Sequence, residues 1–244
     1  MTYTVMAKCA ETGAIGIAIT TASANVSKTL PVVRGLVPTL SPDGAIVCSQ
    51  SMGNPMLPHT AFELLDRGVP FDEFEEAFAA EDEFLGYRQV GVLTVGGDLW
   101  AFTGDTCFPE KGHYVGDDFL VMGNCLGPDT LGAMKDAYES GTKTDLADRL
   151  LSTLEAGRAA GGQYWEGEPI PELFCALYVY DGVNPYPKVD MRVDFDLSAV
   201  EKMRRMYDQL HARTETYFET MYRRPHEFKD TASKLLLEVA SKQI

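Results

Sequence analysis

Residues 1–23 read MTYTVMAKCAETGAIGIAITTAS, and this stretch decides how the fold begins. It contains two apolar runs, residues 2–9 and 14–22, which the tetrad ETGA separates. Short apolar runs bounded by a glycine-containing turn are typical of neighbouring β-strands, and Gly13 suits the turn because glycine adopts positive φ at little cost. We therefore predict two strands joined by a tight turn, with Thr2 at the start of the first strand.

The rest of the chain alternates between groups of strands and groups of helices. Further strands are predicted in PVVRGLVPTL (31–40), GAIVCSQS (44–51), RQVGVLTV (88–95), LWAFTGD (99–105), GHYVGDDFLVMGN (112–124) and ELFCALYVYDG (172–182). Helical spacing of apolar residues predicts helices within 59–68, 71–82, 128–140 and 144–160. Thr144 or Asp145 is the expected N-cap of the last of these helices.

The C-terminal part differs in its periodicity. Apolar residues recur there at alternating intervals of three and four, with one polar member, at Val200, Met203, Tyr207, Leu210, Thr214, Tyr217 and Met221. This pattern predicts a long amphipathic helix over 198–224, which packs either on its own domain or on a second copy in a homo-oligomer such as a dimer. We therefore divide the chain into a domain at 1–197, this helix, and a tail at 225–244.

Composition narrows the class of protein. The 244 residues are 45% hydrophobic, enough for one compact domain with a sizeable core. The net charge of −15 repels phosphate backbones and anionic lipids, so we expect no nucleic-acid partner and no membrane. The five cysteines form no CxxC pair, which argues against a disulfide scaffold and a structural zinc site. The N-terminus has no signal-peptide pattern, and we predict a cytoplasmic protein.

The order of the elements favours an α+β fold in which mainly antiparallel sheets are covered by helices. A four-layer αββα sandwich would bury both faces of two such sheets. The sequence has no GxGxxG after a strand, no phosphate-binding loop, no HExxH and no GxSxG. Its four histidines are far apart in the sequence. We therefore expect no metal and no cofactor, and a small molecule as the substrate.

Thr2 is the candidate nucleophile. A threonine hydroxyl is a weak nucleophile unless a base lies beside it, and removal of Met1 would supply that base as the α-amino group of Thr2 itself. The reference pKa of an α-amino group is roughly 7.7–8.0, so part of it is neutral near pH 7. The simpler interpretation is that Thr2 only begins a strand. A cysteine nucleophile, Cys9 or Cys125 aided by His113, is a further alternative.

Several segments resemble a known family. They are MTYTVMAKCAETGAIGIAI (1–19), RQVGVLTVGGDLWAFTG (88–104), KGHYVGDDFLVMGNCL (111–126), LADRLLSTLEAGRAAGG (146–162) and YPKVDMRVD (186–194). In this order they resemble the domain of unknown function 1028 family, assigned to the N-terminal nucleophile (Ntn) hydrolase superfamily. The resemblance implies a four-layer αββα sandwich of two mainly antiparallel sheets. It also implies hydrolysis of a small amide, N-acyl or cyclic amide compound by the N-terminal residue.

The same resemblance points to site residues. Arg88 and Gln89 match a family motif and are candidate substrate contacts, although Arg88 could instead pair with an acid at 81–83. Asn124, after Gly123, could stabilise an oxyanion or satisfy a turn.

Three further residues are candidates for binding the substrate. His113 lies in a matching segment, with a surface hairpin position as the alternative. Ser23 and Ser49 stand at strand ends, where they could line a cleft or satisfy turns.

The segment GGQYWEGEPIPELFCA (161–176) departs from the family pattern, and the active-site lysine of proteasome-type relatives has no secure counterpart. The competing hypothesis is therefore a non-catalytic ligand-binding or oligomeric scaffold protein that keeps the Ntn fold.

Overall fold

We describe a computed structural model of the chain, covering residues 1–22, 45–141, 145–183, 187–218, 224–227, 233–234 and 237. The chain divides into two compact units, Met1–Met203 and Arg204–Ile244. The predicted C-terminal helix is α6 (Ala199–Phe218), which begins in the first unit. The strands and the other helices named below all lie in the first unit.

The larger sheet has six strands in the order β11-β10-β2-β1-β7-β6, and every neighbouring pair is antiparallel. The strands are β1 (Thr2–Lys8), β2 (Ile15–Thr21), β6 (Gly112–Val115), β7 (Phe119–Asn124), β10 (Phe174–Tyr180) and β11 (Val189–Asp194). Strand β1 therefore lies inside the sheet, between β2 and β7, and its side chains are buried on both faces up to Ala7. This explains why residues 2–9 read as a continuous apolar run.

Two smaller sheets complete the strands. The first is antiparallel and contains β3 (Ala45–Ser51), β4 (Arg88–Thr94) and β5 (Leu99–Thr103), in that order. The second is a two-stranded hairpin of β8 (Gln163–Trp165) and β9 (Glu168–Ile170). This hairpin lies in the divergent segment 161–176, where the sequence predicted no strand before 172.

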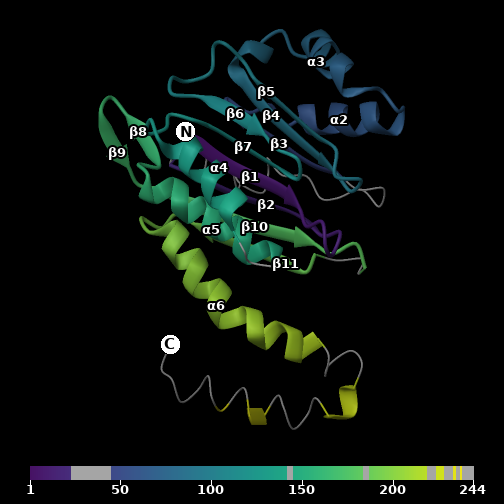
Figure 1. Cartoon of the computed structure of the whole chain (residues 1–244), viewed down its shortest axis with the longest axis vertical. Helices are drawn as coiled ribbons and strands as arrows, with labels where there is room; N and C mark the ends of the chain where they lie inside the picture. The colour runs from purple at the N-terminus through teal and green to yellow at the C-terminus, as the bar shows by residue number, and fades with distance from the viewer. Residues whose placement is uncertain are drawn as a thin grey trace. The chain divides into compact units, whose positions relative to one another are not determined.

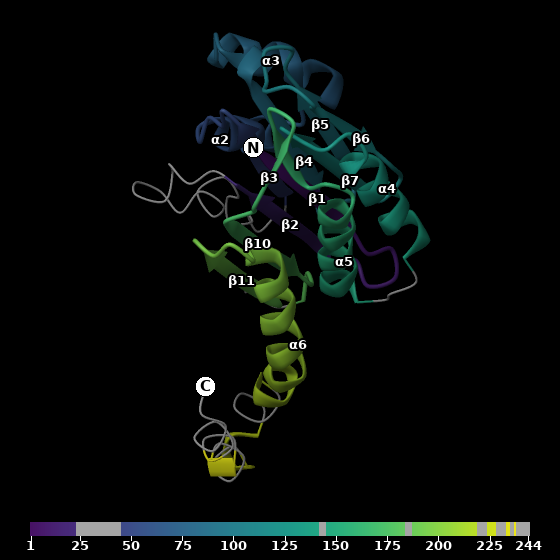
Figure 2. The same cartoon turned by 90° about the vertical axis from the view of Figure 1, so that its left-hand side faces the viewer.

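Helices cover both groups of strands. Helices α4 (Thr130–Ser140) and α5 (Leu146–Ala159) pack on the six-stranded sheet, with α5 against β1, β2 and β10 (Figures 1 and 2). Helix α2 (Leu57–Asp66) packs on β3 and contacts α3 (Phe74–Glu81), which the 3-10 turns η2 (Phe71–Glu73) and η3 (Leu85–Tyr87) flank. Asp145 caps α5 by accepting a hydrogen bond from the backbone N–H of Asp148 at 3.1 Å, as the sequence predicted.

Two apolar clusters hold these layers together. One joins the six-stranded and the three-stranded sheets and includes Met6, Ile46, Leu93 and Met122. A Cβ added to Gly91 would lie 3.0–3.3 Å from Met6 and Met122 atoms, so the two sheets approach closely there. The other cluster lies between the three-stranded sheet and the helices α2 and α3, and it includes Val47, Val90, Phe74 and Phe78.

The α+β class with mainly antiparallel sheets is confirmed. The helices within 59–68, 71–82, 128–140 and 144–160 are confirmed as α2, α3, α4 and α5. The strand predicted at 31–40 lies outside the described residues. Across the described part of the chain, none of the helices combines the length and the apolar character needed to cross a bilayer.

Candidate functional site

The ends of several strands meet beside Thr2. Strand β1 starts there, and the pairing register places Thr2 opposite Thr21 of β2 and Asn124 of β7. The three-stranded sheet brings a matching pair, because Gln50 near the end of β3 lies opposite Gln89 near the start of β4. We call this region the Thr2 end of the sheets.

The hydroxyl of Thr2 points into the space between the two sheets. Side chains two residues apart on a strand share a face, and the hydroxyl of Thr4 donates to Oε1 of Gln50 at 2.6 Å. Thr2 is therefore on the face of β1 that looks toward the three-stranded sheet. Thr2 as a residue is 5% exposed, and its Oγ1 donates to Oγ1 of Thr21 at 3.2 Å. The hydroxyl of Thr21 in turn donates to the carbonyl oxygen of Met1.

The α-amino group of Met1 lies at the same end, within hydrogen-bonding reach of the Cys125 thiol and near Cys107. Burial lowers the pKa of this amine, although both thiols oppose the shift. Burial also raises the pKa of the Cys125 thiol, with the neighbouring amine opposing it. Cys125 has a positive φ of 54°, which turns the chain sharply after β7. The start of β1 is thus enclosed by the segments that contain these two cysteines.

Gln89 is the centre of a buried hydrogen-bond network between the sheets. Its Oε1 accepts from Nδ2 of Asn124 at 2.7 Å and from Nε2 of Gln50 at 3.1 Å. Its Nε2 lies 2.8 Å from the carbonyl oxygen of Gly123, with Thr103 Oγ1 at 3.1 Å and the Gly112 oxygen at 3.2 Å as further acceptors. Both ends of this amide are thus bonded to protein groups, and the side chain is fully buried. This geometry makes Gln89 a group that positions Asn124.

Asn124 is also fully buried, and its two amide atoms differ in their surroundings. Nδ2 donates to Gln89, whereas Oδ1 has no hydrogen-bond partner among the residues that the structure describes. A buried polar atom without a partner is uncommon in folded proteins and is often found where a ligand or an ordered water binds. Asn124 therefore brings a free acceptor to the Thr2 end.

His113 connects to this network through one intermediate. Its Nδ1 lies 2.8 Å from Oγ1 of Thr103, which also receives Nε2 of Gln89. The Thr103 hydroxyl has two acceptor sites and one proton, so it can accept from Gln89 and either donate to Nδ1 or accept from a protonated Nδ1. The imidazole is exposed on β6, as the surface-hairpin alternative predicted.

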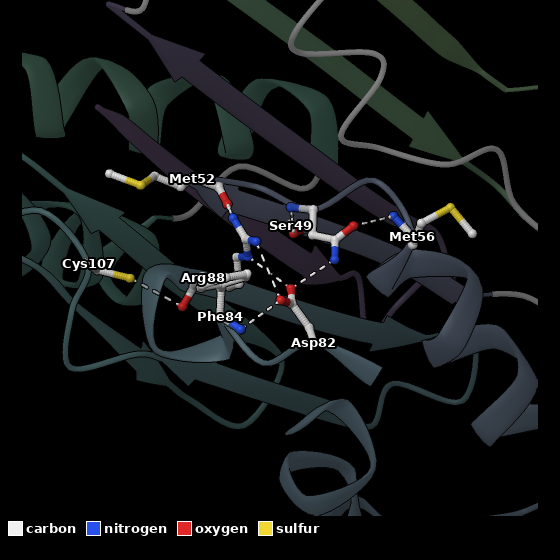
Figure 3. Close-up of polar contacts among 8 residues, drawn as sticks. Ser49, Met52, Met56, Asp82, Phe84, Arg88 and Cys107 are labelled. Atoms are coloured by element: carbon white, nitrogen blue, oxygen red, sulfur yellow. Dashed lines mark hydrogen bonds and ion pairs between the residues drawn. The ribbon is translucent and has the colours of Figure 1, made fainter. Parts of the chain in front are cut away.

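Arg88 is held by an ion pair. Its Nε lies 2.9 Å from Oδ2 of Asp82, and its guanidinium also donates to the carbonyl oxygen of Met52 (Figure 3). Asp82 additionally accepts from Nδ2 of Asn54 at 2.8 Å and from the backbone N–H of Phe84 at 3.0 Å. The structure therefore contains the ion pair between Arg88 and an acid at 81–83 that the sequence offered as the alternative. A contact between Arg88 and a substrate stays a prediction.

Ser49 lies on the other face of the three-stranded sheet. It is opposite Val90 of the helix-facing cluster, and its Oγ accepts from the backbone N–H of Asn54 at 3.0 Å. Ser49 therefore faces away from the six-stranded sheet, and the structure does not bring it together with Thr2. Ser23, the other predicted serine, lies outside the described residues.

The sequence did not indicate that Thr21, Cys107 and Cys125 adjoin the start of β1. Thr21 could have been found from the hairpin register, because pairing Lys8 with Ile15 across the turn places it opposite Thr2. The five cysteines, all within the described residues, are in the thiol form and form no disulfide. Over the described ranges, no group of three or more His, Cys, Asp or Glu side chains is arranged to hold a metal ion.

A comparison of the chain with known protein families found a match. The model of the "Family of unknown function (DUF1028)" matches residues 2–203. A crystal structure of a DUF1028 protein from Silicibacter pomeroyi is 25% identical and superposes with a TM-score of 0.71, covering 86% of this chain and 88% of that one. No protein of curated function matches the chain.

Two more distant structures belong to proteins described as Anbu. The one from Yersinia bercovieri, named an ancestral beta-subunit, is 11% identical, with a TM-score of 0.42 over 88% of this chain and 96% of its own. The Gly-1 mutant from Hyphomicrobium sp. strain MC1 is 13% identical, also with a TM-score of 0.42, over 88% of this chain and 97% of its own. TM-scores this low do not establish a shared fold.

Proposed function

Because the chain belongs to the DUF1028 family, whose function is unknown, we propose from its own geometry that it is an Ntn-type amidohydrolase. Its substrate would be a small amide, N-acyl or cyclic amide compound, and Thr2 would be the nucleophile after removal of Met1. The observation that carries this proposal is the position of Thr2 at the first residue of an internal strand, with its hydroxyl between two sheets and beside Asn124.

The proposed reaction uses two groups of one residue. The hydroxyl oxygen of Thr2 attacks the amide carbonyl carbon while its proton passes to the α-amino group of Thr2. The C–N bond then breaks, the leaving nitrogen takes that proton, and an ester to Thr2 remains. Water attacks the ester, which releases the acid and restores the hydroxyl. The reference pKa of an α-amino group, roughly 7.7–8.0, leaves part of the Thr2 amine neutral and able to act as this base near pH 7.

Asn124 is the proposed donor to the oxyanion. A primary amide nitrogen carries two N–H bonds, and Gln89 accepts one of those on Nδ2 of Asn124. The mechanism assigns the other to the negatively charged oxygen of the tetrahedral intermediate. Gln89 acts through Asn124 in this scheme. His113, which connects to Gln89 through Thr103, and Arg88, the residue before Gln89 on β4, are the proposed contacts to polar groups of the substrate.

We also infer that the fold is the four-layer αββα sandwich of the Ntn hydrolases. Packing of α4 and α5 on the six-stranded sheet, of α2 on β3, and of the two sheets on each other through a shared apolar cluster supports this arrangement. In such a sandwich the first strand lies in one of the two central layers. This matches the place of β1 in the six-stranded sheet.

Hydrolysis of a panel of N-acyl amino acids, lactams and imides tests the proposed function. Thr2→Ala should lower turnover of any substrate found by at least about 10³-fold, and Thr2→Ser should retain part of it. Thr12→Ala, in the turn at the far end of the β1–β2 hairpin, is the matched control and should match the wild type. Equal turnover by Thr2→Ala would refute the proposal. Absence of turnover across the panel, with Thr2 verified as the N-terminal residue, would favour the non-catalytic binding or scaffold role.

A further inference from the structure

Gln163, the first residue of β8, has an unusual environment for a buried amide. Its side chain is fully buried, and neither Nε2 nor Oε1 has a hydrogen-bond partner within the part of the chain that the structure describes. A buried donor or acceptor left unpaired destabilises a fold, and this residue leaves both ends of its amide unpaired. Such a pair is stable in a fold when something else occupies its hydrogen bonds.

The backbone of β8 ties this amide to the Thr2 end of the sheets. The N–H of Tyr164 donates to the carbonyl oxygen of Cys125 at 2.7 Å, and Gln163 forms a β-bridge with Leu126. These two partners directly follow Asn124, the residue opposite Thr2. The hairpin from the divergent segment 161–176 is therefore paired with the loop that leaves the candidate site.

The face of β8 that carries Gln163 looks toward the segment 107–109. Side chains two residues apart on a strand share a face, and the indole of Trp165 packs edge-on against the ring of Phe108, with centroids 5.6 Å apart. The same segment bonds the far side of the loop, because the Pro109 carbonyl accepts from the N–H of Cys125 at 2.9 Å. The backbone of β8 and the α-amino group of Met1 are thus both next to Cys125.

Charges near this amide are already paired. The carboxylate of Glu172, which accepts the backbone N–H of Gln163 at 3.4 Å, also accepts the hydroxyl of Tyr3 at 3.0 Å. Its other oxygen lies 3.3 Å from Nη1 of Arg158. A ligand at Gln163 would therefore meet a paired carboxylate, which favours a neutral molecule over an ion.

A primary amide presents N–H and C=O side by side on one edge. The group that complements this edge is another amide with its own N–H and C=O on the same side, which forms two hydrogen bonds with it. Ordinary open-chain secondary amides are trans and hold these two groups on opposite sides, whereas lactams, imides and cyclic ureides are constrained to be cis. We propose that Gln163 binds the cis-amide edge of a neutral cyclic amide.

This inference rests on the proposed function, because it selects the cyclic amides from the substrate class given there. It assigns a role to the segment that departs from the family pattern. Binding can be measured apart from hydrolysis, since Thr2→Ala removes the nucleophile and leaves Gln163 and Asn124 in place. Alanine is also small enough for Met1 to be cleared, and intact mass would verify the N-terminus of each protein.

Calorimetric titration of Thr2→Ala with hydantoin is the test, with 1,3-dimethylhydantoin, which has no N–H, as the matched ligand. We expect hydantoin to bind and the dimethyl compound to bind at least about tenfold more weakly. Adding Gln163→Met should weaken hydantoin binding by at least about tenfold. Adding Gln209→Met, at an exposed position of α6, should leave binding unchanged.

Three results would overturn the inference: no hydantoin binding, equal binding of the two ligands, or unchanged binding in Gln163→Met. If Gln163→Met does not fold, the comparison of hydantoin with 1,3-dimethylhydantoin on the Thr2→Ala protein, which keeps Gln163, still tests the inference. Binding through Gln163 combined with equal turnover of Thr2 and Thr2→Ala proteins would refute the proposed catalysis and leave this inference standing. Thr2-dependent hydrolysis of open-chain amides, with no hydrolysis or binding of cyclic amides, would support the proposed catalysis and refute this inference.

Discussion

Replacement of Gln89 by leucine should destabilise the protein strongly. Leucine is close to glutamine in size but forms no hydrogen bonds, so the change removes the centre of the network and opens no large cavity. Two buried side-chain amides, Nδ2 of Asn124 and Nε2 of Gln50, would lose the acceptor that lies 2.7 and 3.1 Å from them. Each orphaned donor costs about 2 kcal/mol, within the range measured for buried unsatisfied groups.

The free energy of unfolding should therefore fall by about 4 kcal/mol, with each of the two amides contributing about half. The carbonyl oxygens of Gly112 and Gly123 and the hydroxyl of Thr103 also lose a donor, while the buried leucine adds some apolar stabilisation. These smaller effects oppose each other. A loss of this size is a large part of the roughly 5–15 kcal/mol that holds a typical domain folded.

Urea unfolding followed by tryptophan fluorescence measures this effect, since Trp100 and Trp165 both lie in the first unit. Gln209→Leu is the control, because this glutamine is exposed and its change should shift stability by less than about 0.5 kcal/mol. A Gln89→Leu protein within about 1 kcal/mol of the wild type would refute the reasoning, since the network would then carry no net stability.

Four further substitutions test other parts of the structure. Burial acts to raise the pKa of Asp82, but hydrogen bonds from Arg88, Asn54 and the Phe84 N–H outweigh it and lower that pKa. Asp82→Asn should therefore destabilise by about 2–3 kcal/mol at pH 7, with the difference from wild type shrinking in urea titrations as pH falls below about 4; a constant difference would contradict this. Tyr3→Phe should cost about 1–2 kcal/mol, because the fully buried hydroxyl donates to Glu172, and an unchanged urea midpoint would contradict it. Gly104→Ala should destabilise the protein by more than about 2 kcal/mol in thermal unfolding, because the new Cβ would lie 2.2 Å from the Gly86 oxygen. Gly132→Ala in α4 should instead stabilise it by up to about 1 kcal/mol, because no atom lies within 4 Å of the new Cβ and alanine favours a helix.

Local patterns in the sequence were sufficient for most elements of the fold. The strands of residues 2–9 and 14–22 and the cap at Asp145 follow from apolar runs, a turn and a capping residue, all of which act over a few positions. The β8–β9 hairpin was missed because its strands are only three residues long and one contains Pro169, which argues against a strand. Its pairing with the loop after β7 depends on long-range contacts.

The candidate site was accessible to sequence reasoning only in part. Thr2 and Asn124 were singled out separately, and their direct pairing comes from the register of β1 with β7. Arg88 could not be assigned, because Glu81, Asp82 and Glu83 are equally near in sequence and only the end of α3 decides which carboxylate faces it. Gln163 could be recognised as a departure from a family pattern, but burial without a partner is a property of the folded chain.

The central claim is that the working protein begins at Thr2 and reacts through its hydroxyl. Treatment with a β-lactone, followed by intact-mass measurement and mapping of the adduct, tests it directly. We predict that the purified protein lacks the mass of one methionine residue and that a single ester adduct forms on Thr2, absent from Thr2→Ala and present in Thr2→Ser. An active protein that retains Met1, or an adduct that persists in Thr2→Ala, would contradict the account.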